Sequence, residues 1–249
     1  MESLTSLKNP RVRQWAALKD RRERREQGCF LVEGRRSVTD ALASPFPLKA
    51  LLVTDPQDPF IRPGLPVFQL PEHVMAHVCD TRSPQGVAAV MGMRDTRAEG
   101  ARLVILDGLQ DPGNVGTILR TADAAGLDGL ILSADCADPF SPKVLRATMG
   151  SVFHLPVEIA ENLPDRLRAL QSDGWVVFSS QLDGMPFREG AFPPPDRWCL
   201  VIGNEGNGVR ESIRCLADRR VCLPMRGRAE SLNAGVAAGI MMYMLLEET

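Results

Sequence analysis

The sequence has few of the residues that hold metals or form disulfides. Its 249 residues include six cysteines and three histidines, with no Cys-x-x-Cys pair and no metal-ligand spacing between the two residue types. We therefore expect no metal and no disulfide framework, but a reduced, cytoplasmic protein with buried thiols. Cys199 and Cys222 lie inside apolar segments, which are a poor place for a reactive thiolate and argue against a covalent mechanism.

The sequence also lacks a membrane anchor and the common nucleotide-binding motifs. The most apolar run, residues 234–246, is too short to cross a bilayer and indicates a buried helix, and residues 1–15 contain no apolar core of a signal peptide. There is no Gly-x-x-x-x-Gly-Lys-Ser/Thr loop, and "GNEGNG" does not match the Gly-x-Gly-x-x-Gly pattern. His154 falls in a predicted strand and the other histidines lie in the N-terminal part, so no Ser/His/Asp set is indicated.

Basic residues are concentrated at the N-terminus. Residues 1–36 hold ten Lys and Arg against five acids, a local charge of +5 in a chain whose net charge is −2. One interpretation of "LKDRRERREQG" is a face that contacts phosphates. The other is a solvated helix with Glu–Arg pairs, because Glu23 and Glu26 stand among the arginines.

The apolar pattern indicates two α/β domains. In the N-terminal part we expect a basic helix over residues 9–27, further helices at 35–43 and 71–79, and strands at 29–34, 48–54, 66–70 and 86–93. Polar residues then interrupt the pattern. The sequence predicts a domain over residues 1–93, a linker over 94–101 and a second domain over 102–249.

In the second domain, apolar strands alternate more regularly with helices. We expect strands at 102–107, 129–133, 152–158, 175–181, 198–203 and 219–224, and helices at 115–125, 141–149, 162–172, 206–216 and 231–247. Continuous apolar strands of this kind predict a parallel sheet covered on both faces.

Three of these predicted strands end in loops rich in glycine and polar residues. The loops are "DPGNVG" after residue 110, "GNEGNGV" after residue 202 and "LPMRGRAESLN" after residue 222. Each has a structural reading: Asn114 or Ser231 would cap a helix, and the glycines would form a tight turn. Because ligands of α/β sheets bind beyond the carboxyl ends of the strands, the three loops together predict a binding crevice. Arg120 lies off the apolar stripe of its helix and is free to point to solvent or into this crevice.

These three stretches, in this order, resemble the three motifs of the SpoU (TrmH-like) family of RNA 2′-O-ribose methyltransferases, in the SPOUT superfamily. "DPGNVGTILRTADAAG" is similar to motif 1, "VIGNEGNGV" to motif 2 and "LPMRGRAESLNAGVAAG" to motif 3. The segment from "SLKNPRVRQW" to "RRSVTDAL" resembles the N-terminal RNA-binding domain of that family. One departure is Ala234–Gly235, where many members have a β-branched residue and a serine.

The resemblance implies transfer of a methyl group from S-adenosylmethionine to a ribose 2′-hydroxyl of RNA, without a metal. It implies a trefoil knot in the C-terminal domain and a homodimer. Gly235 and Gly239 would permit the close packing of such a dimer, or equally the packing of a crowded core. Carried over to this sequence, the catalytic residues would be Asn114, Arg120, Glu205, Ser231 and Asn233. The cofactor-binding residues would be Gly203, Leu223, Met225 and Leu232.

The resemblance also favours RNA contact by the basic N-terminal face. The expected RNA-binding residues are Lys8, Arg11, Arg13, Arg21, Arg22, Arg24, Arg25 and Arg35. Large-subunit rRNA is the preferred substrate, because the separate N-terminal domain is like that of rRNA-directed members. The alternatives are a tRNA 2′-O-methyltransferase, a non-enzymatic RNA-binding protein, and a nucleotide-binding α/β enzyme unrelated to RNA.

Overall fold

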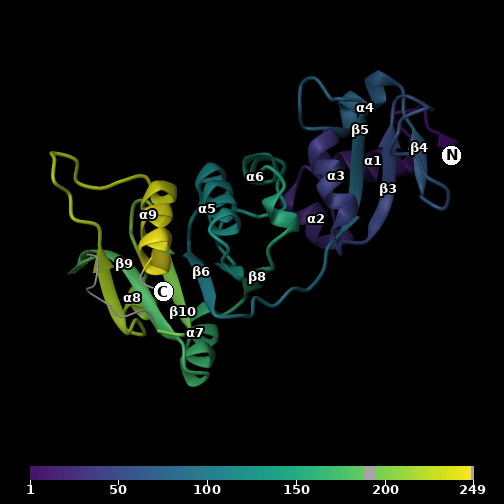
Figure 1. Ribbon diagram of the computed structural model, residues 1–249. Coiled ribbons are helices and arrows are strands. Elements are labelled where there is room, and N and C mark those ends of the chain that lie inside the picture. The colour runs from purple at the N-terminus through teal and green to yellow at the C-terminus, as the bar shows by residue number, and fades with distance from the viewer. Residues whose placement is uncertain (188–194, 248–249) are drawn as a thin grey trace. The chain divides into compact units, whose positions relative to one another are not determined.

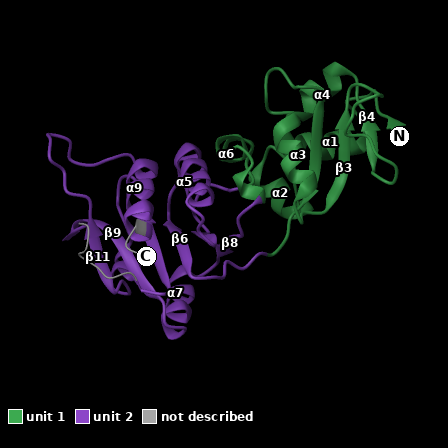
Figure 2. Cartoon of the chain, viewed as in Figure 1, with its two compact units in different colours: residues 1–95, 140–153 green, residues 96–139, 154–249 purple. Residues whose placement is uncertain are grey.

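The computed structural model describes residues 1–187 and 195–247 and divides the chain into two compact units (Figure 2). Unit 1 contains Met1–Asp95 and Phe140–Phe153, and unit 2 contains Thr96–Pro139 and His154–Thr249. The segment Phe140–Phe153 therefore lies between two strands of unit 2 in the sequence but packs within unit 1.

Unit 1 is built on a five-stranded mixed sheet with the strand order β1-β4-β3-β5-β2, in which β5 runs antiparallel to both of its neighbours. The four strands and the two helices expected after residue 28 are all present. The elements of unit 1 are β1 (Glu2–Ser3), α1 (Pro10–Ala17), α2 (Arg21–Gln27), β2 (Cys29–Glu33), α3 (Arg35–Ala43), β3 (Leu48–Val53), β4 (Val67–Gln69), α4 (Glu72–Val78), β5 (Val87–Gly92), α6 (Pro142–Thr148) and the 3-10 turn η1 (Ser151–Phe153).

The single basic helix expected over residues 9–27 is wrong, because the chain forms two helices there. Asp20 begins the second one, and its carboxylate accepts hydrogen bonds from the main-chain N–H groups of Arg22 (2.7 Å) and Glu23 (3.4 Å). An aspartate at this position satisfies N–H groups that a helix leaves unpaired at its start. The guanidinium of Arg24 then folds back to donate to the carbonyl oxygens of Leu18 and Lys19, each at 2.8 Å.

Four phenylalanines join Phe140–Phe153 to the sheet of unit 1. The ring of Phe30 in β2 lies 4.6 Å from that of Phe140, and Phe46 lies 5.8 Å from Phe140 and 5.9 Å from Phe153, centroid to centroid. Such ring pairs add about 0.5–1.5 kcal/mol beyond the apolar area they bury. This aromatic cluster therefore combines residues that lie about a hundred positions apart along the chain.

Unit 2 is built on a six-stranded, fully parallel sheet with the strand order β11-β9-β10-β6-β7-β8 (Figure 1). The parallel sheet expected from the sequence is confirmed. The elements of unit 2 are β6 (Arg102–Asp107), α5 (Pro112–Ala124), β7 (Gly129–Ser133), β8 (Val157–Ala160), α7 (Leu163–Ser172), β9 (Val176–Pro186), β10 (Trp198–Gly203), α8 (Glu211–Arg214), β11 (Arg219–Cys222) and α9 (Ala234–Glu247).

Helices cover both faces of this sheet, as expected. Helices α5 and α9 pack together on one face and α7 and α8 on the other (Figure 1). Gly235 and Gly239 of α9 lie against Thr117 and Thr121 of α5, so these glycines serve packing within the chain. Because all six strands are parallel, the loops after β6, β10 and β11 leave the sheet at the same edge.

Two expected elements of unit 2 differ in the structure. The prediction of a strand over residues 152–158 is wrong for its first half, because Val152 and Phe153 belong to η1 and are buried in unit 1. His154 is consequently not in a strand; it is exposed, and its Nδ1 lies 2.9 Å from the Asp123 carboxylate. The helix expected at 206–216 is limited to Glu211–Arg214, because the preceding glycine-rich residues form a loop. None of the helices in residues 1–187 and 195–247 is long and apolar enough to span a membrane.

We predict that Phe140→Ala destabilises unit 1, although residue 140 lies in the sequence of the second predicted domain. Loss of a buried phenylalanine from a packed cluster costs about 3–5 kcal/mol. Amide hydrogen exchange should therefore accelerate in β2 and β5. Phe60→Ala, at a half-buried ring outside this cluster, serves as the control. Unchanged protection of β2 in the Phe140 variant would show that the segment does not stabilise unit 1.

Candidate functional site

A cavity of about 650 Å³ opens at the carboxyl edge of the unit 2 sheet, beside residues 180–183 of β9 and the ends of β10 and β11. This volume is in the range of small-molecule sites. Apolar side chains such as Ile202, Leu223 and Met241 line part of it, and the polar loop Asn204–Gly208 lines another part. The binding crevice expected beyond the strand ends is therefore present, with the loops after β10 and β11 on its wall.

Asn114 ties all three polar loops together. Its Nδ2 donates to Glu205 Oε1 at 2.8 Å, and its Oδ1 accepts from Asn233 Nδ2 at 2.8 Å. Asn114 is only 8% exposed, so both of its polar atoms are satisfied away from solvent. Motifs separated by about a hundred residues thus meet at one amide.

Asn114 is able to do this because another residue caps its helix. Asp111 is the N-cap of α5 and accepts from the main-chain N–H of Asn114 at 2.8 Å, so the reading of Asn114 as the N-cap is wrong. Ser231 does not cap the last helix either. Asn233 does, and its Oδ1 accepts from the N–H groups of Gly235 (2.9 Å) and Val236 (3.2 Å).

The loop after β10 turns so sharply that it requires glycine at residue 203. A β-carbon on Gly203 would overlap the carbonyl carbon of Gly208 and the nitrogen of Val209. Asn204 and Gly208 exchange main-chain hydrogen bonds of 3.0 and 2.9 Å, which close the turn. The Asn204 side chain also donates to the carbonyl oxygen of Gly108 at 2.8 Å and so joins this loop to the end of β6.

Sequence reasoning missed a second link between these loops. Asp107, the last residue of β6, is 1% exposed and accepts hydrogen bonds from the main-chain N–H of Arg210 (2.8 Å) and from its Nε (2.7 Å). The hydrogen bond to Asp107 raises the pKa of the Arg210 guanidinium. The sequence does show an acidic residue, Asp107, at the end of an apolar strand, which is a signal for a functional or structural role. It does not show the partner, because Arg210 becomes a neighbour of Asp107 only when β10 lies beside β6.

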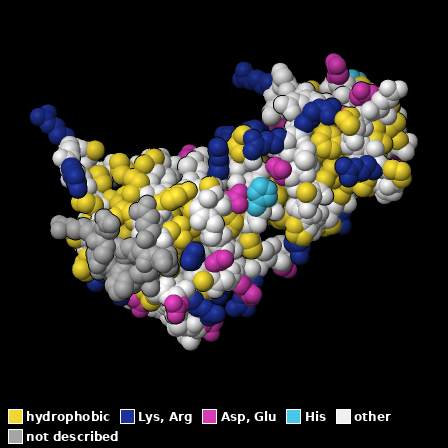
Figure 3. Space-filling view, in the orientation of Figure 1, with side chains coloured by type: hydrophobic (Ala, Val, Ile, Leu, Met, Phe, Trp, Pro, Cys, Tyr) yellow, Lys and Arg dark blue, Asp and Glu magenta, His cyan; other side chains and the backbone are white. Residues whose placement is uncertain are grey.

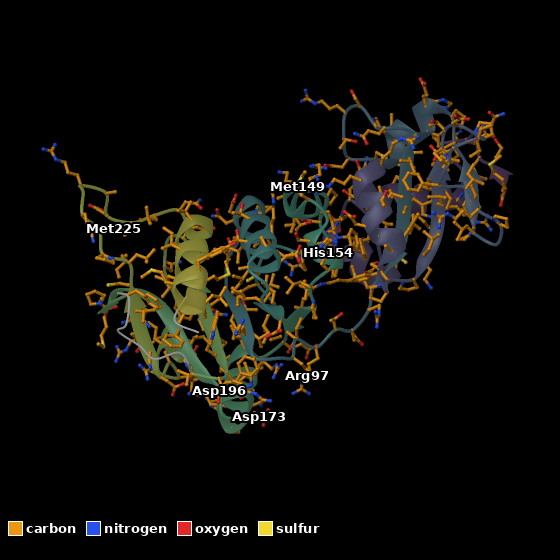
Figure 4. The ribbon with its side chains drawn as sticks, viewed as in Figure 1. Arg97, Met149, His154, Asp173, Asp196 and Met225 are labelled. Atoms are coloured by element: carbon orange, nitrogen blue, oxygen red, sulfur yellow. The ribbon has the colours of Figure 1, made fainter. Side chains whose placement is uncertain are left out.

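The predicted site residues divide into two groups. Four cofactor residues and three catalytic ones line the cavity: Gly203, Leu223, Met225, Leu232, Glu205, Ser231 and Asn233. Met225 lies on the segment that joins β11 to α9 (Figure 4). Asn114 and Arg120 do not line the cavity. Asn114 lies behind the lining, bonded to Glu205 and Asn233, whereas Arg120 is exposed on α5 and has no hydrogen bond or ion pair with any residue that the structure describes.

The two thiols considered in the sequence analysis differ in their surroundings. Cys199 is fully buried in β10, and burial raises the pKa of its thiol, so it stays protonated at neutral pH. Cys222, the last residue of β11, lines the cavity and donates to the carbonyl oxygen of Gly184 at 3.1 Å. Within the described ranges, the structure contains no group of three or more His, Cys, Asp or Glu that could hold a metal ion.

The expected RNA-binding residues of unit 1 differ in their availability. Arg24 is 2% exposed and bonded to main-chain carbonyls, which makes it a poor phosphate ligand and corrects the expectation for this residue. Arg11, Arg22 and Arg35 form ion pairs with Glu2, Glu26 and Asp58, while Arg21 is half-buried. Lys8, Arg13 and Arg25 are exposed, and their charged groups have no partner in the described part of the chain.

Comparison with known proteins finds a matching family for each of the two parts of the chain. Residues 101–243 match the SpoU rRNA Methylase family, and residues 9–89 match the MRM3-like substrate binding domain. The chain is 40% identical to the 23S rRNA (guanosine(2553)-2′-O)-methyltransferase RlmP of Bacillus subtilis, over 98% of this chain and 99% of the relative.

Two solved structures share the fold across nearly the whole chain. One is an AdoMet-bound rRNA methyltransferase from Sinorhizobium meliloti, with 35% identity, a TM-score of 0.89 and coverage of 99% and 97% of the two chains. The other is the SpoU methyltransferase AviRb from Streptomyces viridochromogenes in complex with AdoMet, with 29% identity, a TM-score of 0.85 and coverage of 96% and 98%.

We predict that Asp107→Asn loosens the loop after β10. The new amide would direct N–H donors at the donors of Arg210, and an unsatisfied buried polar group costs about 1–3 kcal/mol. Amide hydrogen exchange over residues 204–210 should therefore accelerate, and the thermal unfolding temperature should fall. Asp165→Asn removes one side of the exposed Arg168–Asp165 pair and should leave both measurements unchanged. Equal behaviour of the two variants would contradict a structural role for Asp107.

Proposed function

The chain belongs to the SpoU rRNA methylase family, and from this premise we propose that it transfers a methyl group from S-adenosylmethionine to a ribose 2′-hydroxyl of large-subunit rRNA. The observation that carries the proposal is the hydrogen-bonded chain Glu205–Asn114–Asn233, which joins the three motif loops at one cavity. A non-enzymatic RNA-binding protein would need neither this chain nor the cavity.

The residues of the cavity fit the cofactor. S-adenosylmethionine combines a flat adenine with a positively charged methionine end, and it supplies an electrophilic methyl group on a sulfonium. Apolar side chains of Ile202, Leu223 and Met241 suit the purine ring. The exposed carboxylate of Glu205 lines the same cavity and suits the positive charge, whereas the carboxylate of Asp183, also in the lining, pairs with Arg214 at 3.2 Å. Gly203, Met225 and Leu232 would complete the binding surface.

We assign Arg120 to the RNA rather than to the cofactor. Its guanidinium is exposed, and a guanidinium is a planar cation that can donate two parallel hydrogen bonds to a phosphate. It would hold the phosphate beside the target ribose, favour loss of the hydroxyl proton and stabilise the negative charge that develops on the attacking oxygen. Asn114 would act by fixing the motif loops, so that donor and acceptor meet in line.

The substrate class follows from the N-terminal unit together with the relatives. Residues 9–89 match a substrate-binding domain, and the Bacillus subtilis relative is named for methylation of guanosine 2553 in 23S rRNA. We therefore propose that residues 1–93 hold rRNA through exposed basic side chains such as Lys8, Arg13 and Arg25. Residues 102–249 would form the methyltransferase domain, with the trefoil knot of its family, and residues 94–101 would be the linker.

We predict that Arg120→Ala lowers the rate of methyl transfer by about 100-fold or more, because a charge that stabilises the transition state is lost. The measurement is transfer of labelled methyl from S-adenosylmethionine to separated rRNA, tRNA and ribosomal particles, followed by alkaline hydrolysis, which spares 2′-O-methylated linkages. Arg120→Lys should also be slow, because lysine lacks the two-pronged guanidinium.

The matched control is Arg168→Ala, which removes an exposed arginine from α7 on the opposite face of the sheet. It should retain full activity. Label found only in tRNA would overturn the choice of substrate, and near-normal activity of Arg120→Lys would overturn the role given to the guanidinium.

We further propose that the protein forms a homodimer through α9. Val236, Ile240 and Tyr243 recur at helical spacing on this helix and are 50%, 41% and 46% exposed. Hydrophobic side chains gather over the part of unit 2 where α9 lies (Figure 3). Contiguous exposed apolar residues of this kind mark interaction surfaces, and tyrosine is enriched in them.

Ile240→Arg should therefore convert a dimer into a monomer, as measured by light scattering coupled to size-exclusion chromatography. A charge buried without a partner in an apolar interface costs several kcal/mol. Ile159→Arg is the matched control, because Ile159 is also 41% exposed but lies on the edge strand β8, whereas α9 packs against α5 and β10. A monomeric wild-type protein, or a dimeric Ile240 variant, would refute this interface.

A further inference from the structure

One buried oxygen at the cavity has no hydrogen-bond partner in the described chain. Gln181 of β9 lines the cavity and is only 9% exposed. Its Nε2 donates to Ser179 Oγ at 2.9 Å, whereas its Oε1 is buried and accepts no hydrogen bond. An acceptor left unsatisfied in this way costs about 1–3 kcal/mol, and native proteins contain few of them.

We infer that Gln181 Oε1 accepts a hydrogen bond from the exocyclic amino group of the cofactor's adenine and thereby selects adenine over hypoxanthine. This inference rests on the proposed function, because it assumes that S-adenosylmethionine binds in this cavity. It makes Gln181 a residue that determines cofactor specificity, in addition to the motif residues.

The surroundings of Gln181 favour the adenine amino group over the other donors of the cofactor. A primary ammonium would have to lose its hydration to reach a buried neutral amide, which is costly. The same cavity offers it the exposed carboxylate of Glu205. The adenine amino group is neutral and planar, and it is attached to a ring that suits the apolar lining of Ile202, Leu223 and Met241.

The chemical consequence is a difference between two purines of the same shape. Adenine presents two N–H donors at its 6-position, whereas hypoxanthine presents a carbonyl oxygen there. That oxygen would face Oε1 with no hydrogen between them, so a buried acceptor would remain unpaired. Sites built to hydrogen-bond a ligand group reject analogues that lack the group far more strongly than apolar pockets reject a change of size.

The test is calorimetric binding to the full chain of S-adenosylhomocysteine and of its deaminated analogue, S-inosylhomocysteine. We expect the wild-type protein to bind the adenine compound about 10- to 100-fold more tightly, which corresponds to one hydrogen bond to a buried acceptor. Gln181→Met keeps the length of the side chain without the oxygen. It should weaken binding of the adenine compound about tenfold and bring the ratio between the two ligands close to one.

Gln181→Asn is a second variant, which retains an amide but withdraws the oxygen by one methylene group. This variant should also reduce the ratio of the two binding affinities, and it replaces the methionine variant in the test if that variant does not fold. The matched control is Gln171→Met on α7, where Nε2 donates to the carbonyl oxygen of Leu216 away from the cavity. That variant should leave the ratio at its wild-type value.

The outcomes separate this inference from the function on which it rests. If the wild-type protein binds neither compound, the assignment of the cavity to S-adenosylmethionine fails. If it binds both compounds equally, or if the Gln181 variants keep the wild-type ratio, the cofactor assignment stands and the role of Gln181 is overturned.

Discussion

The site of this protein depends on one side-chain amide, that of Asn114, which is hydrogen-bonded on both sides. Asn114 is shared by Glu205 and Asn233, and each of these three residues comes from a different motif. Removing either neighbour would leave a nearly buried amide partly unsatisfied, which is why the three loops have to be formed together. The ion pair between Asp107 and Arg210 secures the same junction from the strand end. The cavity is therefore set by polar contacts between loops, on a sheet whose packing is apolar.

Arginines serve two different purposes in this chain. Arg24 and Arg210 have their guanidinium groups engaged within the protein, by main-chain carbonyls in one case and by the carboxylate of Asp107 in the other. Arg13, Arg25 and Arg120 are exposed and have no partner in the described part of the chain. The excess of positive charge near the N-terminus is thus a mixture of structural and available groups. Only the available ones suit an anionic ligand.

Local sequence signals predicted most elements, and long-range contacts explain where they failed. The predicted strands Arg102–Asp107 and Trp198–Gly203 are confirmed. A short uninterrupted apolar run is typical of a strand that is buried on both faces of a parallel sheet. Asp20 could have been recognised as a helix start inside "LKDRRERR", which would have divided the basic helix. The apolar run at Val152 and Phe153 looks like a strand by itself, but these side chains complete a core in unit 1. The local sequence does not distinguish a strand of unit 2 from a segment that packs into unit 1.

The same limit applies to the site. The three motif loops could be placed at one sheet edge from the pattern of strands, and the cavity lies there. The partner of Asp107 could not be found, because it depends on β10 being inserted between β6 and β9. Gln181 was also missed, since its significance lies in an oxygen that lacks a partner rather than in any motif.

The position of Phe140–Phe153 has a consequence for the order in which the protein is made. When a ribosome has synthesised Met1–Asp95, the ring of Phe30 still lacks its contacts with Phe140 and Phe153. At about 5–20 residues per second, the missing segment follows only after several seconds. During that time the nascent N-terminal unit exposes aromatic surface, and it closes its core only when β6 and β7 of the other unit have already been synthesised.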